Sequence, residues 1–469
     1  MIRAAASALI LLALAACAPG TLSQNQAQNQ AQDRAQSELT DLPPMKMFAG
    51  PSVHGPKRAN SDIASDFLNL SFFLESGRPL PVFTRFEGPV TIRVLGTTPP
   101  SMLPDLDRLI TRLRREAGID IRRVTPDSAA SITIETIPRT ELQRAVPSAA
   151  CFVVPRVTGW ADFKRNRRSS VTDWTTLTVR ERMAIFIPSD VAPQEIRDCL
   201  HEEVAQALGP LNDLYSLTDS VFNDDNFHTV LTGFDMLILR ATYAPELQSG
   251  MDRDTVAQRL PMILARINPA GLIRRADPRA PTTRAWIDSI EEALGPRTSL
   301  SRRQTAAKRA VTLARAGNWN DNRLAFSLFA LGRLSLGRDG ELALASFLQA
   351  GGIYATNPET QVHEAHIAMQ LAAFALSSGQ AQVALDIVDR HTGAVAEAEN
   401  AALLATLLLI KVESLELLGR TAEAAALRRD SLGWARYGFG DDTEVRKRAG
   451  EIAALNPRRR PGANRDNAT

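Results

Sequence analysis

The stretch CLHEEVAQALGPLND, residues 199–213, predicts a helix that ends near Gly209. It opens on His201-Glu202, the first half of the metal-binding spacing HExxH, whose second histidine would fall at position 205. Two metal ligands on one helix must be four residues apart to face the same ion, and residue 205 is alanine. In this register the helix holds no metal.

A shift of one residue gives a second spacing, Glu202-Glu203-x-x-Gln206-x-x-Gly209-x-x-Asn212. It resembles HExxHxxGxxH, the helix of the metzincin peptidases, with the three histidines replaced by Glu, Gln and Asn. By that resemblance Glu203 stands in the place of the general base. Gly209 stands where the helix must end so that a third ligand can turn back.

The residues at these degenerate ligand positions are poor zinc ligands. Zinc prefers histidine nitrogen and cysteine sulfur, whereas Gln206 and Asn212 offer neutral amide oxygens. Asp213, His228 or Asp235 could add a ligand from the segment that follows. We predict no metal and no cofactor, and leave a weakly held hard cation or a zinc ion as alternatives.

The same polar residues also have a purely structural interpretation. Gln206, Asn212 and Asp213 could satisfy buried backbone groups of the loop that wraps the helix end, since each unpaired buried donor costs about 1–3 kcal/mol. Glu202 and Glu203 are adjacent and carry like charges. At least one of them should therefore face solvent or a cation.

The residues around this helix alternate between strand and helix patterns. We predict three helices, at 62–76, 103–118 and 193–209. We predict five strands, at 88–96, 119–124, 131–137, 151–157 and 183–188. Sheet elements followed by a long helix match the order in a zincin half-domain, so we predict an α+β zincin-like domain over residues 48–266.

Several segments together resemble one family. They are FFLESGRPLPVFTRFEGP (72–89), EEVAQALGPLND (202–213), DSVFND (219–224) and LTGFDMLILRATYAPELQSGM (231–251). The family is an uncharacterised domain-of-unknown-function family of Gram-negative lipoproteins, thought to be zincin-like, and the resemblance covers residues 60–255. It implies a fold and a location but no established activity.

Residues 284–456 read as helix throughout, after a proline-containing linker at 267–283. Three stretches share a glycine followed by an amphipathic helix with a small residue: SLGRDGELALASFLQA, SSGQAQVALDIVDR and LLGRTAEAAALRRD. Their spacing of about 40 residues resembles tetratricopeptide-type helical hairpins, so we predict an all-α helical-repeat domain of the α-solenoid type. We interpret His363 and His366, in HEAH, as surface residues rather than a metal pair.

The N-terminus has the features of an export signal. Arg3 precedes an apolar run from Ala4 to Ala16, which is shorter than the roughly 20 residues a membrane span needs. Leu14-Ala15-Ala16-Cys17 resembles the lipobox of bacterial lipoproteins, so residues 1–16 are predicted to be cleaved and Cys17 to carry lipid. An ordinary signal peptide with an incidental Cys17 is the alternative. An Asp after the lipidated cysteine would favour the inner membrane, and residue 18 is alanine. We therefore expect an anchor in the outer membrane, with the protein facing the periplasm.

The segments near the two ends read as disordered. Residues 17–47 contain the tract SQNQAQNQAQDRAQ, which has no apolar period and predicts a tether. Residues 457–469 predict a disordered tail. The net charge of +2 gives no reason to expect a nucleic-acid partner, so the membrane, through Cys17, and a protein or peptide are the expected partners.

With Cys17 lipidated, two cysteines remain, Cys151 and Cys199. Export to an oxidising compartment predicts a disulfide between them, and two reduced core cysteines are the alternative.

These features favour a lipid-anchored envelope protein that binds or scaffolds proteins or peptides through a degenerate, non-catalytic zincin-like domain and its helical repeats. The alternative is a metallopeptidase with Glu203 as general base. The residues favour the binding protein and leave the enzyme open.

Overall fold

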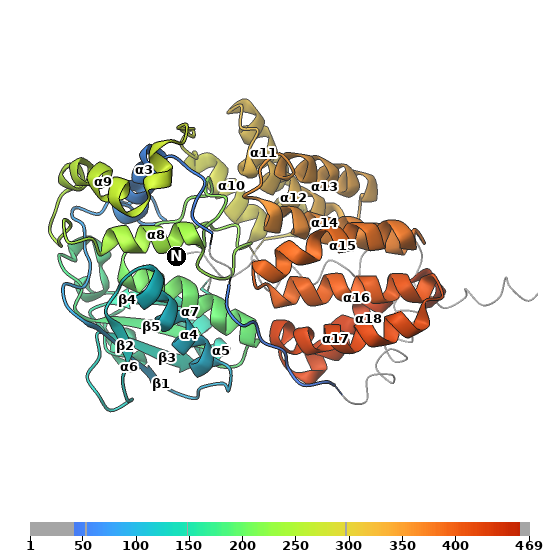
Figure 1. Ribbon diagram of the computed structural model, residues 1–469, viewed down its shortest axis with the longest axis horizontal. Coiled ribbons are helices and arrows are strands. Elements are labelled where there is room, and N and C mark those ends of the chain that lie inside the picture. Colours follow the sequence, from blue (N-terminus) through green and yellow to red (C-terminus); the bar gives the residue numbers. More distant parts are fainter. Residues whose placement is uncertain (1–41, 52–53, 148, 296–297, 460–469) are drawn as a thin grey trace, which may run out of the picture. The chain divides into compact units, whose positions relative to one another are not determined.

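The computed structural model describes residues 42–51, 54–147, 149–295 and 298–459 (Figure 1). The chain divides into two compact units, the first built mainly of Ser52–Val191 and Glu195–Thr282 and the second mainly of Thr283 onwards. The predicted signal peptide, Cys17, most of the predicted tether and most of the predicted tail lie outside the described residues. The first unit is α+β and the second is all helical, as the sequence predicts.

The first unit contains a five-stranded sheet with the order β2-β1-β3-β5-β4. Its strands are β1 (Val90–Leu95), β2 (Ile121–Arg123), β3 (Ile132–Ile137), β4 (Phe152–Pro155) and β5 (Met183–Pro188). The pairs β1–β2, β1–β3 and β3–β5 are parallel, and β4 is an edge strand that runs antiparallel to β5.

The helices of this unit connect and cover the strands. They are α3 (Asn60–Ser71), α4 (Met102–Glu116), α5 (Arg139–Ala145), α6 (Trp160–Asn166), α7 (Pro193–Leu208), α8 (Gly233–Thr242) and α9 (Arg253–Ile267). The segment 159–174, between β4 and β5, contains α6. Trp160 and Phe163 explain this helix, because both are buried three residues apart on one face.

Two hydrophobic cores lie on the two faces of the sheet, and β5 contributes to both. Met183, Ile185 and Ile187 enter a core that they share with α3, α4, α7, α8 and α9. Ala184 and Phe186 point the other way, into a smaller core with α5 and α6. This strand is buried along its whole length, which accounts for its uninterrupted apolar sequence MAIFIP.

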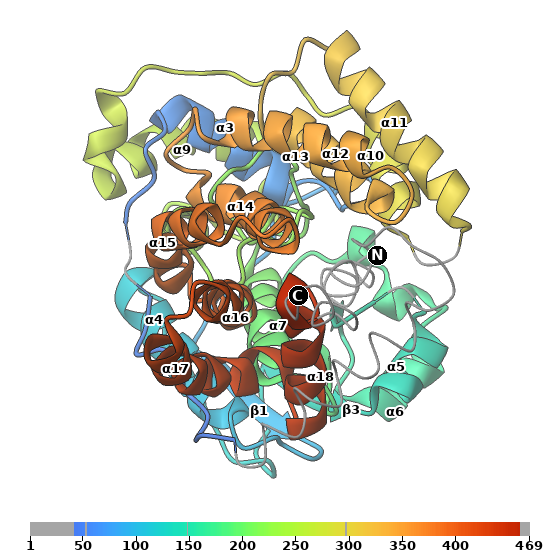
Figure 2. The same cartoon turned by 90° about the vertical axis from the view of Figure 1, so that its right-hand side faces the viewer.

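The second unit is a succession of helices. They are α10 (Arg284–Leu294), α11 (Leu300–Ala316), α12 (Asn322–Ser335), α13 (Gly340–Tyr354), α14 (Gln361–Ser377), α15 (Ala381–Glu397), α16 (Ala401–Leu417), α17 (Thr421–Phe439) and α18 (Asp442–Ala453). Each helix packs on the next, and Figure 2 shows α14 to α17 stacked in order. Three pairs joined by short turns, α12–α13, α14–α15 and α16–α17, coincide with the three similar stretches of sequence.

The glycines and alanines of those stretches have identifiable roles. Gly379 and Gly419 end α14 and α16 with a φ of 78° each, a left-handed conformation that favours glycine. The small residues of the second helix in each pair are fully buried: Ala343, Ala384 and Ala424. Small side chains at these points let paired helices approach closely.

The prediction that His363 and His366 lie on the surface is wrong. They are 0% and 3% exposed on α14. The reason is that α14 packs against α13, α15 and α16, so that its polar positions are covered as well as its apolar ones.

The predicted tether and tail are partly ordered. Lys46 donates its backbone N–H to the Gly433 carbonyl at 2.9 Å, and Phe48 stacks on Trp434 with ring centroids 4.4 Å apart. The end of the predicted tether therefore lies against α17, where Phe48, the next residue, has Trp434 as an aromatic partner. At the other end, Pro457–Arg459 forms a short 3₁₀ turn. Within the described residues, no helix combines the length and the apolar character needed to cross a bilayer.

Candidate functional site

The motif lies on α7, which follows β5 and begins with Pro193. Proline suits the first position of a helix, because the backbone N–H that it lacks would have no acceptor within the helix there. The helix ends at Leu208, and the Gly209 N–H bonds the Ala205 carbonyl at 3.1 Å. A Cβ atom on Gly209 would lie 2.9 Å from Thr242 Cγ2. This glycine is thus required by the close approach of α8.

A buried arginine holds the C-terminal end of α7. Arg180 donates from its guanidinium to the carbonyl oxygens of Gln206, Ala207 (2.8 Å) and Gly209, and to Thr84 Oγ1 (3.2 Å). The last carbonyls of a helix have no intrahelical partners, and a cation also opposes the helix dipole there. Burial lowers the pKa of Arg180 to about 10, so it remains protonated at neutral pH.

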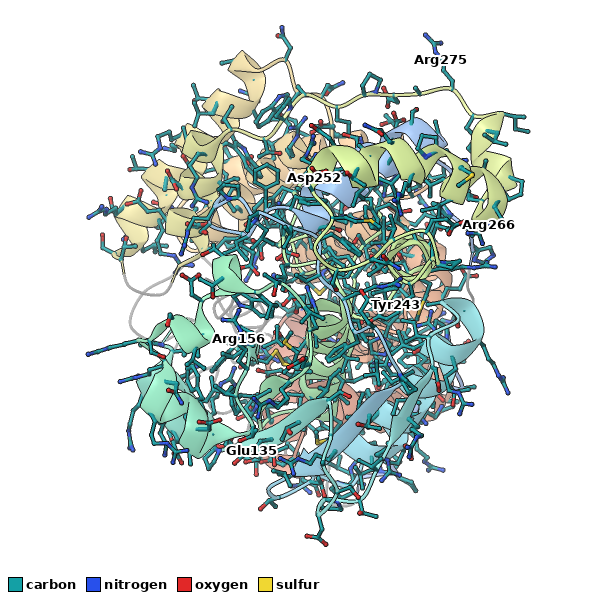
Figure 3. All side chains as sticks on the ribbon, turned by 90° about the vertical axis from the view of Figure 1, so that its left-hand side faces the viewer. Glu135, Arg156, Tyr243, Asp252, Arg266 and Arg275 are labelled. Carbon is teal, nitrogen blue, oxygen red and sulfur yellow. A yellow bond between two sulfur atoms is a disulfide. The ribbon has the colours of Figure 1, made fainter. Side chains whose placement is uncertain are left out.

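A tyrosine completes this set of contacts. Tyr243, which directly follows α8 and is labelled in Figure 3, donates its hydroxyl to the Leu208 carbonyl at 3.1 Å. Burial raises its pKa, so it stays a donor. The end of α7 is therefore fixed by side chains from two other segments.

A pocket of about 300 Å³ lies beside α7. Glu203 and Gln206 line it from the helix, and the edge strand β4 lines it with Phe152 and Val153. Trp174 and residues from 74–78 and 167–173 close the remaining sides. The pocket combines one deeply placed carboxylate with apolar and aromatic walls.

The predicted site residues separate into two groups. Glu203, 1% exposed, and Gln206, 5% exposed, both line the pocket. Glu202 is partly exposed, as expected for one of two adjacent carboxylates, and lies with a carboxylate oxygen within 4.8 Å of those of Glu203 and of Cys151 Sγ.

Asn212 and Asp213 do not join them among the described lining residues of the pocket. The Asn212 side chain donates to the Asn69 carbonyl at 3.0 Å, and its backbone N–H donates to the Leu70 carbonyl at 3.2 Å. Asn212 therefore satisfies the carbonyls near the end of α3. Of the residues after Gly209, Leu211 lines the pocket, whereas the Asn212 side chain is bonded to the end of α3. Gln206 and Asn212 therefore do not share the pocket as the metzincin spacing predicts.

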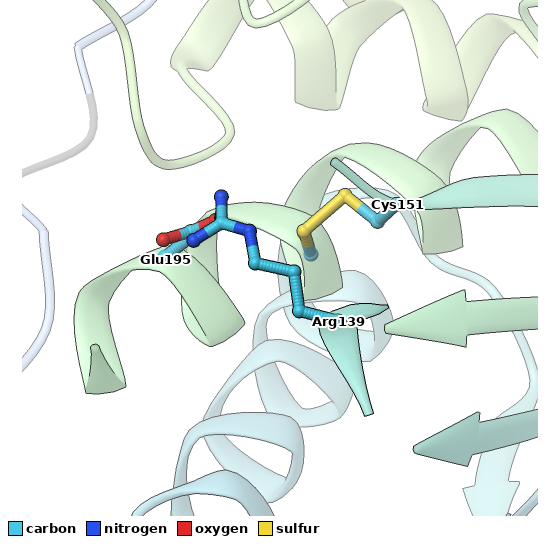
Figure 4. Close-up of a disulfide and its surroundings, with 4 residues drawn as sticks. Arg139, Cys151 and Glu195 are labelled. Atoms are coloured by element: carbon cyan, nitrogen blue, oxygen red, sulfur yellow. A yellow bond between two sulfur atoms is a disulfide. The ribbon is translucent and has the colours of Figure 1, made fainter. Parts of the chain in front are cut away.

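Cys151 and Cys199 form a disulfide bond that joins the start of β4 to α7 (Figure 4). Their Cα atoms are 6.0 Å apart. Close by, Arg139 Nη2 contacts Glu195 Oε1 at 2.8 Å and connects α5 to the same helix. Since Cys151 also lines the pocket, the disulfide forms part of its wall.

These residues do not fit a zinc ion. Among the residues that the structure describes, the group with ligand spacing is Cys151, Glu202 and Glu203, and its sulfur is already bonded to Cys199. A thiolate is what would make such a group attractive to zinc, and two carboxylates alone do not make a zinc site. His228, considered from sequence as a further ligand, bonds the Thr218 carbonyl through Nε2 at 3.1 Å.

Asp235, the other ligand considered, has a structural role. It accepts from the N–H groups of Val221 (3.1 Å) and Thr232 (2.8 Å) and from the Ser220 hydroxyl, and with Thr232 it forms the capping box of α8. Burial raises its pKa to about 6, against the effect of these hydrogen bonds.

His201 is not one of the described lining residues of the pocket, and it links α7 to the segment before α8. Its Nδ1 accepts the Leu231 N–H at 3.0 Å, which requires the proton on Nε2 in the neutral ring. Burial lowers the pKa of His201 well below 6.5, and the charges of Arg197, Arg112 and Arg108 add to this effect. The histidine of the apparent HExxH motif is a neutral structural acceptor.

This predicts a specific pH dependence. The unfolded chain protonates His201 below about pH 6.5 and the folded chain does not, so the free energy of unfolding should fall as the pH drops, with a limiting slope of about 1.4 kcal/mol per pH unit. A His201→Asn variant keeps an acceptor for Leu231 and lacks this term. Urea unfolding of both proteins from about pH 7 to about pH 5 measures the difference.

That difference is the informative quantity because Asp235 acts in the opposite direction. Its raised pKa means that the folded state binds a proton more readily, so its contribution to stability grows as the pH falls towards the unfolded value of 3.8. Both proteins share this term. A difference between wild type and His201→Asn that does not change with pH would show that His201 takes up a proton as readily in the folded state as in the unfolded chain.

The pocket, α7 and the sheet all fall within one family match. Residues 60–262 match the family model for a protein of unknown function, DUF2927. The DUF2927 domain begins at α3 and ends inside α9, and its extent agrees with the resemblance over residues 60–255 noted from sequence. No curated protein and no solved structure matches the chain.

Proposed function

We propose that the DUF2927 domain is a degenerate zincin-like domain that binds an extended peptide segment at the pocket beside α7 and does not cleave it. The observation that carries this proposal is the position of the pocket along β4. An edge strand offers backbone donors and acceptors to a further strand, and an adjacent pocket can take one side chain of that strand.

The charge of the pocket indicates which side chain. Glu203 is the most deeply buried of its acidic residues, and Glu75 lies nearer the surface. Two arginines also line the pocket: Arg78 lies 3.6 Å from Asp173, and Arg167 donates to the Ala145 carbonyl at 3.1 Å. Three carboxylates, those of Glu75, Asp173 and Glu203, outnumber them. A lysine or arginine side chain would therefore meet a complementary carboxylate, whereas an acidic side chain would meet a like charge.

The wider proposal places this domain in the bacterial envelope. The lipobox-like sequence ending at Cys17 supports a lipid anchor, and the Cys151–Cys199 disulfide is typical of an exported protein. The helix pairs of the second unit, with their buried alanines, support a helical-repeat scaffold. Incorporation of labelled palmitate that is lost in a Cys17→Ser variant tests the anchor.

The peptide proposal is tested with labelled decapeptides of valine and threonine that carry one central lysine or one central glutamate. We expect the lysine peptide to bind about tenfold more tightly in fluorescence polarisation, a difference of about 1.4 kcal/mol. Glu203→Gln should remove this preference. Glu181→Gln, which neutralises an exposed carboxylate outside the pocket lining, should keep it.

The competing function is a metallopeptidase in which Glu203 acts as general base. It predicts about one tightly held equivalent of zinc in the purified protein and peptide cleavage that Glu203→Gln abolishes. Metal analysis and mass spectrometry of the incubated decapeptides measure both. Bound zinc with Glu203-dependent cleavage would replace the binding proposal by the enzyme. Equal affinity for the lysine and glutamate peptides would contradict the binding proposal.

A further inference from the structure

A second pocket, of about 680 Å³, lies between α4 and β2. The strand β2 is the edge of the sheet opposite to β4, and this pocket shares no described lining residue with the one beside α7. Three arginines line it, Arg114 from α4 and Arg122 and Arg123 from β2. An inference about this pocket does not depend on the function proposed above.

The charges of the pocket are unequal. Arg123 holds Asp107 through two parallel hydrogen bonds, from Nε at 2.7 Å and from Nη2 at 2.9 Å, and this contact raises the pKa of Arg123. Asp107 is the carboxylate in the described lining, and it compensates one of the three guanidinium charges. Arg114 and Arg122 are exposed, so the pocket has a surplus of two positive charges.

Hydroxyl groups line the same wall. Thr125 Oγ1 and Ser128 Oγ lie 2.9 Å apart, and the Ser128 carbonyl accepts from Arg93 Nη1 at 3.3 Å. Thr111 adds a third hydroxyl from α4, which donates to the Asp107 carbonyl at 2.8 Å. The pocket thus offers guanidinium donors from α4 and β2, with hydroxyl groups beside them that bond within the protein.

We propose that this pocket binds a phosphate group carried by a larger molecule. Guanidinium groups match the oxygen geometry of phosphate and bind it through paired, charge-assisted hydrogen bonds. The volume exceeds that of a bare phosphate ion, which favours a phosphate ester. A soluble phosphorylated compound and a phospholipid headgroup share this chemistry, and the test distinguishes them.

The test measures binding of glycerol 3-phosphate by calorimetry, and of phosphatidylcholine vesicles with and without phosphatidylglycerol by sedimentation, using the full chain. Arg122→Gln and Arg114→Gln should each weaken binding about tenfold, as expected for the loss of one charged hydrogen-bond donor. Arg115→Gln is the matched control. It removes the same charge from the neighbouring exposed position of α4, outside the lining, and should change affinity less than about twofold.

Asp107→Asn gives a prediction of opposite sign. It removes the carboxylate that occupies Arg123, so affinity for phosphate should rise about fivefold or more. Binding of glycerol 3-phosphate would identify a soluble ester as the ligand, and binding of anionic vesicles alone would identify a headgroup. Either supports a phosphate site. Equal losses in Arg115→Gln and Arg122→Gln, no gain in Asp107→Asn, or no saturable binding to either probe would overturn it.

Discussion

Replacement of Arg180 by methionine is expected to destabilise the α+β unit by about 3–5 kcal/mol. Methionine fills much of the space of the arginine stem but donates no hydrogen bond. The carbonyls of Gln206, Ala207 and Gly209 would remain buried without this donor at the end of α7. Each such group costs about 1–3 kcal/mol, and partial relaxation of the helix end keeps the total below their sum.

Urea unfolding followed by near-ultraviolet circular dichroism measures this loss. Arg182→Met is the matched control, because Arg182 is exposed two residues further along, and the expected change is within about 0.5 kcal/mol. Arg180→Lys should lie between the two, since one ammonium group cannot reach three carbonyls in the way the guanidinium fork does. Equal stability of Arg180→Met and Arg182→Met would mean that water satisfies the end of α7.

The importance of Arg180 could not be predicted from the sequence. It stands in the run RERM, among three charged residues that look alike as surface positions before a strand. It is buried because its guanidinium lies against the end of α7, with the Trp174 ring 5.6 Å away. A polar side chain whose partners are backbone carbonyls of another element leaves no spacing signal.

The strands and α7 were predictable for the opposite reason. The run MAIFIP is apolar throughout because both faces of β5 are buried. VTIRVL alternates because only every second residue of β1 is buried. Such regular burial along a strand leaves a pattern that the sequence shows. The buried polar positions of α14 were missed because three neighbouring helices cover it, and the amphipathic pattern assumes one exposed side.

The candidate site was predicted in part. The spacing on α7 places Glu203 and Gln206 on the face that lines the pocket, because positions three apart on a helix are neighbours. The same spacing suggests that Asn212 would return to the site. It does not, because the direction of the chain after Gly209 is set by the carbonyls of α3 that need donors. Helical spacing gives no information about a segment beyond the end of its helix.

Loss of the Cys151–Cys199 disulfide is expected to destabilise the unit by about 4 kcal/mol. The two cysteines are 48 residues apart, and the unfolded chain gains the corresponding loop-closure entropy when the bond is absent. The double variant Cys151→Ser, Cys199→Ser should therefore unfold at a lower urea concentration than wild type. It should also bind the lysine peptide more weakly, because the disulfide links α7 to the start of β4, and both elements line the pocket.

A reductant separates the effect of the bond from the effect of the substitutions. In reductant, the urea midpoint of wild type should approach that of the double variant. The midpoint of the double variant should not change with reductant, because it lacks the Cys151–Cys199 bond. If reduced wild type binds the lysine peptide as tightly as oxidised wild type does, the serines of the double variant, not the broken bond, disturb the pocket. If the double variant is as stable as oxidised wild type, the core packing of Ile196, Leu200 and Val204 suffices to position α7, and the bond does not stabilise the fold.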